Sequence, residues 1–213
     1  LLALSLLYGT VQGYAMPGTP GAFWAYGLTG AMAQIVATMC MVALFQYRNF
    51  AVGVTFKKTE VLQTALMSFI LLGEGISLGV FIALVIGLVA VLALSDSPKV
   101  EGPLSARVFN RATALGLSSG MLFGVSGATY RGAALALEGG DVFLRAAFGL
   151  ALLTLAQTLI MAAYLRVWER GEIGRVLTSW RVSGLVGVTS MMGSLGGFTA
   201  FGLQKAAYVK ALG

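Results

Sequence analysis

Charged side chains interrupt one otherwise apolar stretch, Phe50–Glu74, which is long enough to cross a bilayer as a helix. Lys57, Lys58 and Glu60 lie well inside this stretch. Charges within a hydrophobic span are energetically costly, and they persist where they face protein or a water-filled cavity. We therefore expect the functional centre of the chain to lie near these three residues.

Helical spacing groups the polar side chains of this stretch. Residues three and four positions apart share a helix face, so Lys57, Glu60, Gln63 and Thr64 form one polar stripe, whereas Lys58 lies about 100° round from Lys57. One interpretation makes Glu60 and Lys58 part of a substrate-binding or proton-coupling site. The other makes Glu60 a structural partner, in an ion pair with Lys57 or with another helix, while one lysine reaches the interface.

Isolated polar residues in other apolar segments are further candidates. Tyr130 and Arg131 lie about two turns inside a segment end, where the guanidinium could bind an anionic substrate group, pair with Glu60 or reach the surface. Gln34 and Gln157 are lone amides that either join helices by hydrogen bonds or line a cavity. The predicted substrate-binding or coupling residues are Glu60, Lys58, Lys57, Gln63, Arg131, Tyr130, Gln34 and Gln157.

The elements that carry these residues are predicted to be membrane helices. Of 213 residues, 58% are hydrophobic and 10% are charged, whereas soluble domains carry about 25% charged residues. The chain has no histidine and one cysteine, Cys40, which excludes histidine catalysis and a disulfide framework. We expect an all-α integral membrane protein whose partner is the lipid bilayer, with no metal or other cofactor. The net charge of +6 lies in connectors, so nucleic acid is not an expected partner.

Hydropathy divides the chain into about seven complete transmembrane helices. Residues 96–111 form a linker between two halves, and residues 166–181 form a charged connector that is predicted to include a short amphipathic helix. The predicted spans are 1–16, 21–45, 50–73, 76–95, 112–137, 142–165 and 182–204, and a further helix begins at residue 206.

The second and seventh spans also form an internal repeat. When the sequence is shifted by 157 positions, the second span aligns with the seventh, and the basic residue that follows each span aligns as well. Because these spans are five helices apart, they run in opposite directions, as the inverted repeats of secondary transporters do. The aligned pairs include Gly27 with Gly184, Leu28 with Leu185, Gly30 with Gly187 and Arg48 with Lys205.

Three segments together resemble the EamA-type transporters of the drug/metabolite transporter (DMT) superfamily. RNFAVGVTFKKTEVLQTALMSFILLGE resembles the fourth helix of that family, ISLGVFIALVIGLVAVLALS the fifth, and LQKAAYVKALG the start of the ninth. The resemblance implies a ten-helix (5+5) inverted-repeat fold, of which this chain holds helices two to eight and the start of nine. Residues 1–95 and 112–213 would be the two repeats. Within the fourth helix the resemblance favours Lys58-Thr59-Glu60, and Lys57 is less expected there.

The resemblance further implies a secondary active transporter in a bacterial inner membrane. Such a protein exports or exchanges a small metabolite, amino acid or drug by alternating access, with proton or counter-substrate coupling and no enzymatic activity. Two alternatives stay open. The acidic pairs Glu138/Asp141 and Glu169/Glu172 leave room for a membrane enzyme acting on lipid-linked substrates, and a non-transporting scaffold is the third possibility. The charge bias of the connectors and the family arrangement predict opposite orientations in the membrane.

Overall fold

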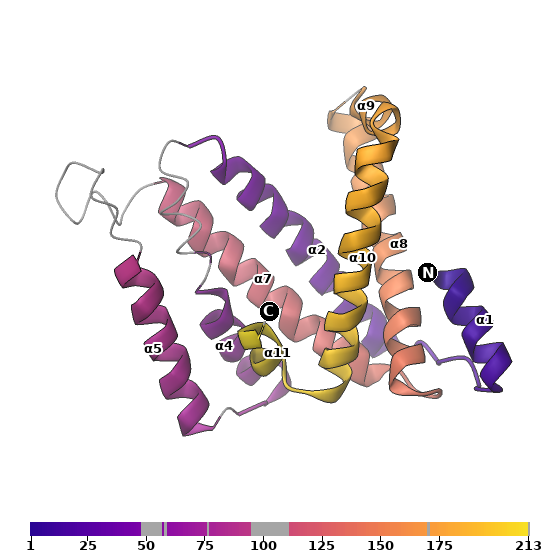
Figure 1. Ribbon diagram of the computed structural model, residues 1–213, viewed down its shortest axis with the longest axis horizontal. Coiled ribbons are helices and arrows are strands. Elements are labelled where there is room, and N and C mark those ends of the chain that lie inside the picture. Colours follow the sequence, from indigo (N-terminus) through magenta and orange to yellow (C-terminus); the bar gives the residue numbers. More distant parts are fainter. Residues whose placement is uncertain (48–56, 58, 76, 95–110, 170, 213) are drawn as a thin grey trace. The chain divides into compact units, whose positions relative to one another are not determined.

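The computed structural model describes residues 1–47, 57, 59–75, 77–94, 111–169 and 171–212. Within these ranges the regular secondary structure is helical, and one isolated antiparallel bridge joins Gly18 to Glu138 (Figure 1). The prediction of an all-α fold is therefore confirmed for the described residues. The helices are α1 (Leu2–Gln12), α2 (Gly21–Leu44), α4 (Glu60–Leu72), α5 (Leu78–Leu94), α7 (Arg111–Ala136), α8 (Val142–Trp168), α9 (Glu172–Thr178), α10 (Trp180–Leu203) and α11 (Ala206–Leu212).

Local sequence explains where the helices that carry the candidate site begin and end. Helix α4 ends at Gly73, whose φ of 66° is accessible to glycine at little cost, and the Gly73 amide donates to the Phe69 carbonyl. Helix α8 begins after Asp141, whose side chain accepts a hydrogen bond from the Leu144 amide at 2.9 Å. That bond satisfies one of the unpaired amides of the first turn.

Three helices of the described part, α2, α8 and α10, are long and apolar enough to cross a membrane. This is fewer than the seven complete transmembrane helices predicted from hydropathy. Helix α4 has 13 described residues, a length of about 20 Å against about 30 Å of hydrocarbon. The first part of its predicted span, residues 50–56 and Lys58, lies outside the described residues. Helix α7 has 26 residues, but its many glycines, serines and threonines lower its hydropathy.

The chain forms two compact units, and each draws residues from both sides of the predicted 96–111 linker. The units reflect packing and the predicted repeats reflect symmetry, so the division into repeats stays a prediction. Unit 1 comprises Leu1–Ala31 and Tyr130–Gln204, and unit 2 comprises Met32–Thr129 and Lys205–Gly213.

In unit 1, helix α8 packs against α1 and α10 (Figure 1). Close approach depends on glycine at Gly149, since a Cβ there would lie 2.8 Å from the Leu137 side chain and 3.5 Å from Phe23. The buried apolar side chains of this unit include Phe23, Leu137, Leu144, Leu153, Phe198 and Phe201.

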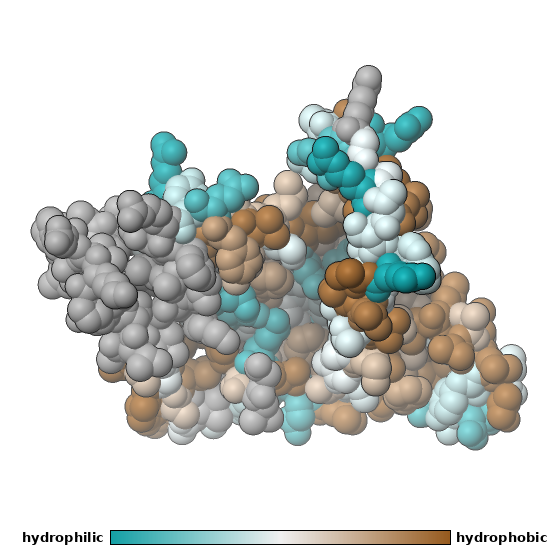
Figure 2. Space-filling model, turned by 45° about the horizontal axis from the view of Figure 1, so that its top comes forward, coloured by the Kyte–Doolittle hydropathy of each residue, from teal (hydrophilic) through white to brown (hydrophobic). Residues whose placement is uncertain are grey.

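The outer surface of unit 1 changes character towards α9. Helix α10 exposes a row of apolar side chains, among them Val182, Leu185 and Met192, which suits contact with lipid. Hydrophilic side chains gather around α9 (Figure 2), where Arg175 and Glu172 form an ion pair at 2.6 Å. The predicted short helix in the 166–181 connector is thus confirmed as α9, although α8 continues to Trp168.

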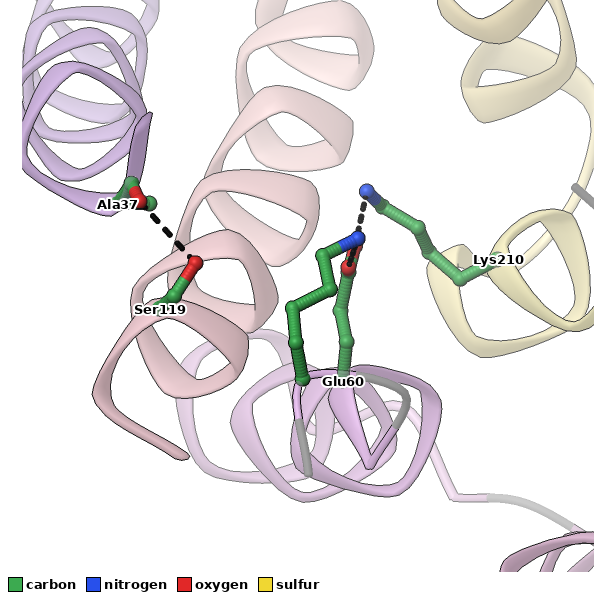
Figure 3. Close-up of polar contacts among 5 residues, drawn as sticks. Ala37, Glu60, Ser119 and Lys210 are labelled. Atoms are coloured by element: carbon green, nitrogen blue, oxygen red, sulfur yellow. Dashed lines mark hydrogen bonds and ion pairs between the residues drawn. The ribbon is translucent and has the colours of Figure 1, made fainter. Parts of the chain in front are cut away.

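In unit 2, helix α4 packs against both α11 and α5. The Ser119 hydroxyl of α7 donates to the Ala37 carbonyl of α2 at 3.0 Å (Figure 3). This side chain is fully buried, so the bond fixes the second half of α2 against the first part of α7. Of these helices, α7 and α11 contact the polar stripe of α4.

Candidate functional site

Glu60 is held by two lysines in unit 2. Its Oε2 lies 2.6 Å from the Lys57 Nζ, three residues earlier in the chain. Its Oε1 lies 2.5 Å from the Nζ of Lys210, which reaches it from α11 (Figure 3). Each carboxylate oxygen therefore has its own ammonium partner. Both ion pairs considered as the structural alternative are present, one local and one between helices.

The carboxylate is the buried member of this cluster. The Glu60 side chain is 8% exposed, against 25% for Lys57 and 28% for Lys210. Both ammonium groups also lie over the ring of Phe123 on α7, with Nζ 4.9 Å (Lys57) and 5.9 Å (Lys210) from its centroid. An aromatic face at such a distance attracts a cation. The ring therefore helps to hold both lysines on one side of Glu60.

The glycines of α7 let α4 come close enough to form this arrangement. A Cβ at Gly120 would lie 2.7 Å from the Gln63 Oε1, and one at Gly124 would lie 3.0 Å from the Thr64 amide nitrogen. A Cβ at Gly127 would lie 3.1 Å from the Lys210 Cε. These contacts are those of close packing, in which small residues let membrane helices approach each other.

The polar stripe of α4 continues from Glu60 into the helix interface. Thr64 and Ser68 follow at intervals of four residues and are 0% and 1% exposed. In the described part of the chain, their hydroxyl oxygens and the Gln63 Oε1 are buried without a hydrogen-bond partner. Buried polar groups are usually paired. Three unpaired polar groups at one helix interface are therefore not explained by packing alone.

The predicted residues Tyr130, Arg131 and Gln157 belong to unit 1. The Gln157 Nε2 donates to the Tyr130 hydroxyl at 3.0 Å, which joins α8 to α7. Arg131 donates through Nη1 to the Phe201 carbonyl of α10. The three residues therefore serve as links between helices in this unit, and the predicted pairing of Arg131 with Glu60 stays a prediction.

Two predicted residues contribute less to this picture. Gln34 is half-buried on the part of α2 that belongs to unit 2, and its main-chain carbonyl accepts a hydrogen bond from the Thr38 hydroxyl at 2.8 Å. Lys58 lies outside the described residues, so its predicted role stays a prediction.

Comparisons with known proteins find no matching family model, no similar curated protein and no similar solved structure. The resemblance to EamA-type transporters is therefore carried by the sequence features alone.

The list of predicted site residues lacked one participant, Lys210. The sequence feature that could have indicated Lys210 is its position as a single charged residue in an apolar helix, AAYVKAL. A charge in such a helix needs a partner, but the sequence does not indicate which of several acidic residues supplies it. Because 150 residues separate Lys210 from Glu60, only the packing of α11 on α4 reveals the pair.

The cluster is suited to binding a charged group, because one carboxylate and two ammonium groups lie together. Among the described residues, no group of three or more histidine, cysteine or acidic side chains could hold a metal ion. Either ammonium group could leave the Glu60 carboxylate and bind a charged ligand, while the other ammonium group stays paired with Glu60. The geometry therefore supports a site that binds a charged group through rearranged ion pairs.

Proposed function

We propose that this chain is a secondary active transporter, an exporter or exchanger that moves a small metabolite, amino acid or drug by alternating access. The buried carboxylate of Glu60, shared by Lys57 and Lys210, carries the proposal. Ionisable groups in membrane helices are costly and mark substrate or ion pathways more often than they serve packing.

We infer further that the fold is the ten-helix inverted repeat of the EamA-type drug/metabolite transporters, set in a bacterial inner membrane. The helices that the repeat brings into register, α2 and α10, are each 24 residues long, which supports this symmetry. Helix α4 ends at Gly73, within the Leu-Leu-Gly-Glu that closes the segment resembling the fourth helix, which supports the assignment of that segment. In this proposal the Glu60 cluster corresponds to the substrate site of repeat-built transporters, which lies between helices near the midplane.

A transport assay that assumes no substrate tests the proposal. The full chain is reconstituted in proteoliposomes and exposed to an isotope-labelled bacterial metabolite extract, and the lumen is analysed by mass spectrometry. Wild-type vesicles are expected to enrich specific compounds over protein-free vesicles. Glu60→Gln is expected to reduce this enrichment by about tenfold or more, because it removes the charge that both lysines share.

Glu138→Gln provides the matched control, because it makes the same substitution at an exposed carboxylate between α7 and α8. It is expected to transport as wild type does. If wild-type vesicles enrich nothing, the transporter proposal is wrong and the scaffold alternative gains. If wild type and Glu60→Gln transport equally, Glu60 is structural.

A further inference from the structure

The ion cluster of unit 2 is unbalanced in charge. Lys57 and Lys210 contribute two ammonium groups, whereas Glu60 contributes one carboxylate. Because each carboxylate oxygen already has an ammonium partner, one positive charge is left in excess among these three described side chains. An uncompensated charge between apolar helices is strongly unfavourable. The cluster therefore calls for a further anion.

Unit 2 does not supply that anion among its described residues. The only other described carboxylate of the unit is Glu74, 14 residues after Glu60 and thus about 20 Å further along. The parts of α2 and α7 that belong to the unit contain no Asp or Glu, and neither do α5 and α11. Among the described residues of the unit, no further carboxylate lies beside the two lysines.

The exposure of the three side chains decides the sign of that group. The accessible parts of the cluster are the lysines, at 25% and 28% exposed, while Glu60 lies beneath them at 8%. Figure 3 shows Lys210 and Glu60 approaching each other from separate helices. Each ammonium has three N–H donors and gives one to Glu60. An approaching ligand therefore meets free N–H donors and positive charge, not the carboxylate.

A neighbouring hydroxyl adds a further donor. Thr64 lies one turn from Glu60 on the same face of α4, is fully buried, and has no hydrogen-bond partner in the described part of the chain. A threonine hydroxyl can donate to an anion as well as accept. The unpaired group thus points to a ligand that brings acceptor oxygens.

We propose that Lys57, Lys210 and Thr64 form a binding site for a small organic anion, such as a carboxylate, and that Glu60 holds the two lysines in place. This deepens the proposed function and rests on it, since the bound anion is the transported compound. The substrate is then an acid or a zwitterion that presents its carboxylate to the lysines. Phe123 supplies an apolar floor beneath the ammonium groups.

Thermal unfolding of the detergent-solubilised full chain in chloride-free buffer tests the site. The probes are acetate, lactate, succinate and citrate, with succinamide and 1,4-diaminobutane as neutral and cationic matches to succinate. At least one of the carboxylates is expected to raise the unfolding temperature in proportion to its occupancy, and neither match is expected to do so. Lys210→Met and Lys57→Met are each expected to weaken the carboxylate's affinity by about tenfold or more.

Two further variants separate the roles of charge and packing. Glu60→Gln is expected to weaken carboxylate binding by about tenfold or more, because the amide no longer holds the two partly exposed ammonium groups beside the site. Lys205→Met removes a lysine of unit 2 that donates to the Gly75 carbonyl at 2.5 Å, and it is expected to leave the affinity unchanged.

The proposal is overturned if none of the four carboxylates shifts the unfolding temperature, if succinamide or the diamine acts as succinate does, or if both lysine variants bind as wild type. These outcomes are distinguishable from failure of the transport proposal. If the vesicles enrich only neutral or cationic compounds, the transport proposal holds and the proposal of an anion site is wrong. If the chain binds a carboxylate but the vesicles enrich nothing, the proposal of an anion site holds and the transport proposal is wrong.

Discussion

Gly124 of α7 lies against the backbone of Thr64 in α4. A Cβ at Gly124 would lie 3.0 Å from the Thr64 amide nitrogen and 3.1 Å from the Gln63 carbonyl carbon. Both atoms belong to the backbone, so neither can turn aside as the end of a side chain can. The separation of the two helices, and with it the position of Glu60 one turn from Thr64, therefore depends on the missing side chain.

Gly124→Ala is accordingly expected to destabilise the chain by about 1–3 kcal/mol, because the added methyl pushes α4 away from α7. The measurement is chemical unfolding of the detergent-solubilised full chain. We also expect the variant to weaken carboxylate binding at the cluster, since α4 carries Glu60.

Gly184→Ala is the matched control for this experiment. Gly184 lies within α10, and a Cβ there meets nothing within 4 Å. Alanine favours helix over glycine, so the variant is expected to be neutral or up to about 1 kcal/mol more stable. Equal destabilisation by the two substitutions would mean that the contact with Thr64 does not set the helix separation.

A second close contact in unit 1 predicts non-additive substitutions. A Cβ at Gly27 of α2 would overlap the Leu153 Cδ2 of α8 and lie 3.2 Å from its Cδ1. Leu153 is 1% exposed and cannot swing aside. Gly27→Ala alone is expected to cost about 1–3 kcal/mol by overpacking, and Leu153→Ala alone about 2–5 kcal/mol by leaving a cavity.

The double variant is expected to cost less than the sum of the single variants by about 1 kcal/mol or more, because the methyl group added at position 27 enters the space that the Leu153 side chain leaves. Chemical unfolding of the four proteins gives this coupling energy. Strict additivity would show that the two positions do not touch in solution.

Hydropathy was sufficient to predict where most of the described helices lie, because a long apolar run flanked by glycine, proline or charge has few other structures available in a membrane. The bounds of α2, α5 and α7 differ from the predicted spans by no more than two residues at either end. The continuation of α8 from Leu165 to Trp168 was missed, since polar and charged residues past a span do not themselves end a helix.

The candidate site was only partly predictable. Residue spacing indicates which side chains share a helix face, but not which residues of other helices they contact. The 3.6-residue period placed Lys57, Glu60 and Thr64 on one helix face, and the structure brings the first two together, although Lys57 precedes the first residue of α4. The partners that come from other helices, Lys210 and Phe123, depend on how α11 and α7 pack. The same holds for Tyr130 and Gln157, which were predicted as separate candidates and turn out to be bonded to each other.

The start of α8 predicts a capping effect. Asp141 accepts a hydrogen bond from the Leu144 amide at 2.9 Å, so Asp141→Ala is expected to cost about 0.5–2 kcal/mol of unfolding free energy. Asp141→Asn retains an oxygen at the same position and is expected to cost less than half as much. A similar loss in both variants, measured by chemical unfolding, would place the effect in the charge and not in the cap.

The hydrogen bond from Gln157 to Tyr130 predicts a coupling between α8 and α7. The Tyr130 ring is 7% exposed and packs against Phe198 with centroids 5.1 Å apart, so Tyr130→Phe keeps the packing and removes only the hydroxyl. Hydrogen bonds between membrane helices are worth about 0.6 kcal/mol on average and up to about 1.7 kcal/mol. Tyr130→Phe and Gln157→Leu are each expected to destabilise within that range.

The double variant Tyr130→Phe with Gln157→Leu is expected to cost less than the sum of the two single variants, because both substitutions break the same shared bond. The transport assay adds a second test of the same pair. If the pair only joins helices, both single variants transport as wild type does once they are folded. A loss of transport in Tyr130→Phe at unchanged stability would instead assign the hydroxyl to substrate, as the lone polar side chains first suggested.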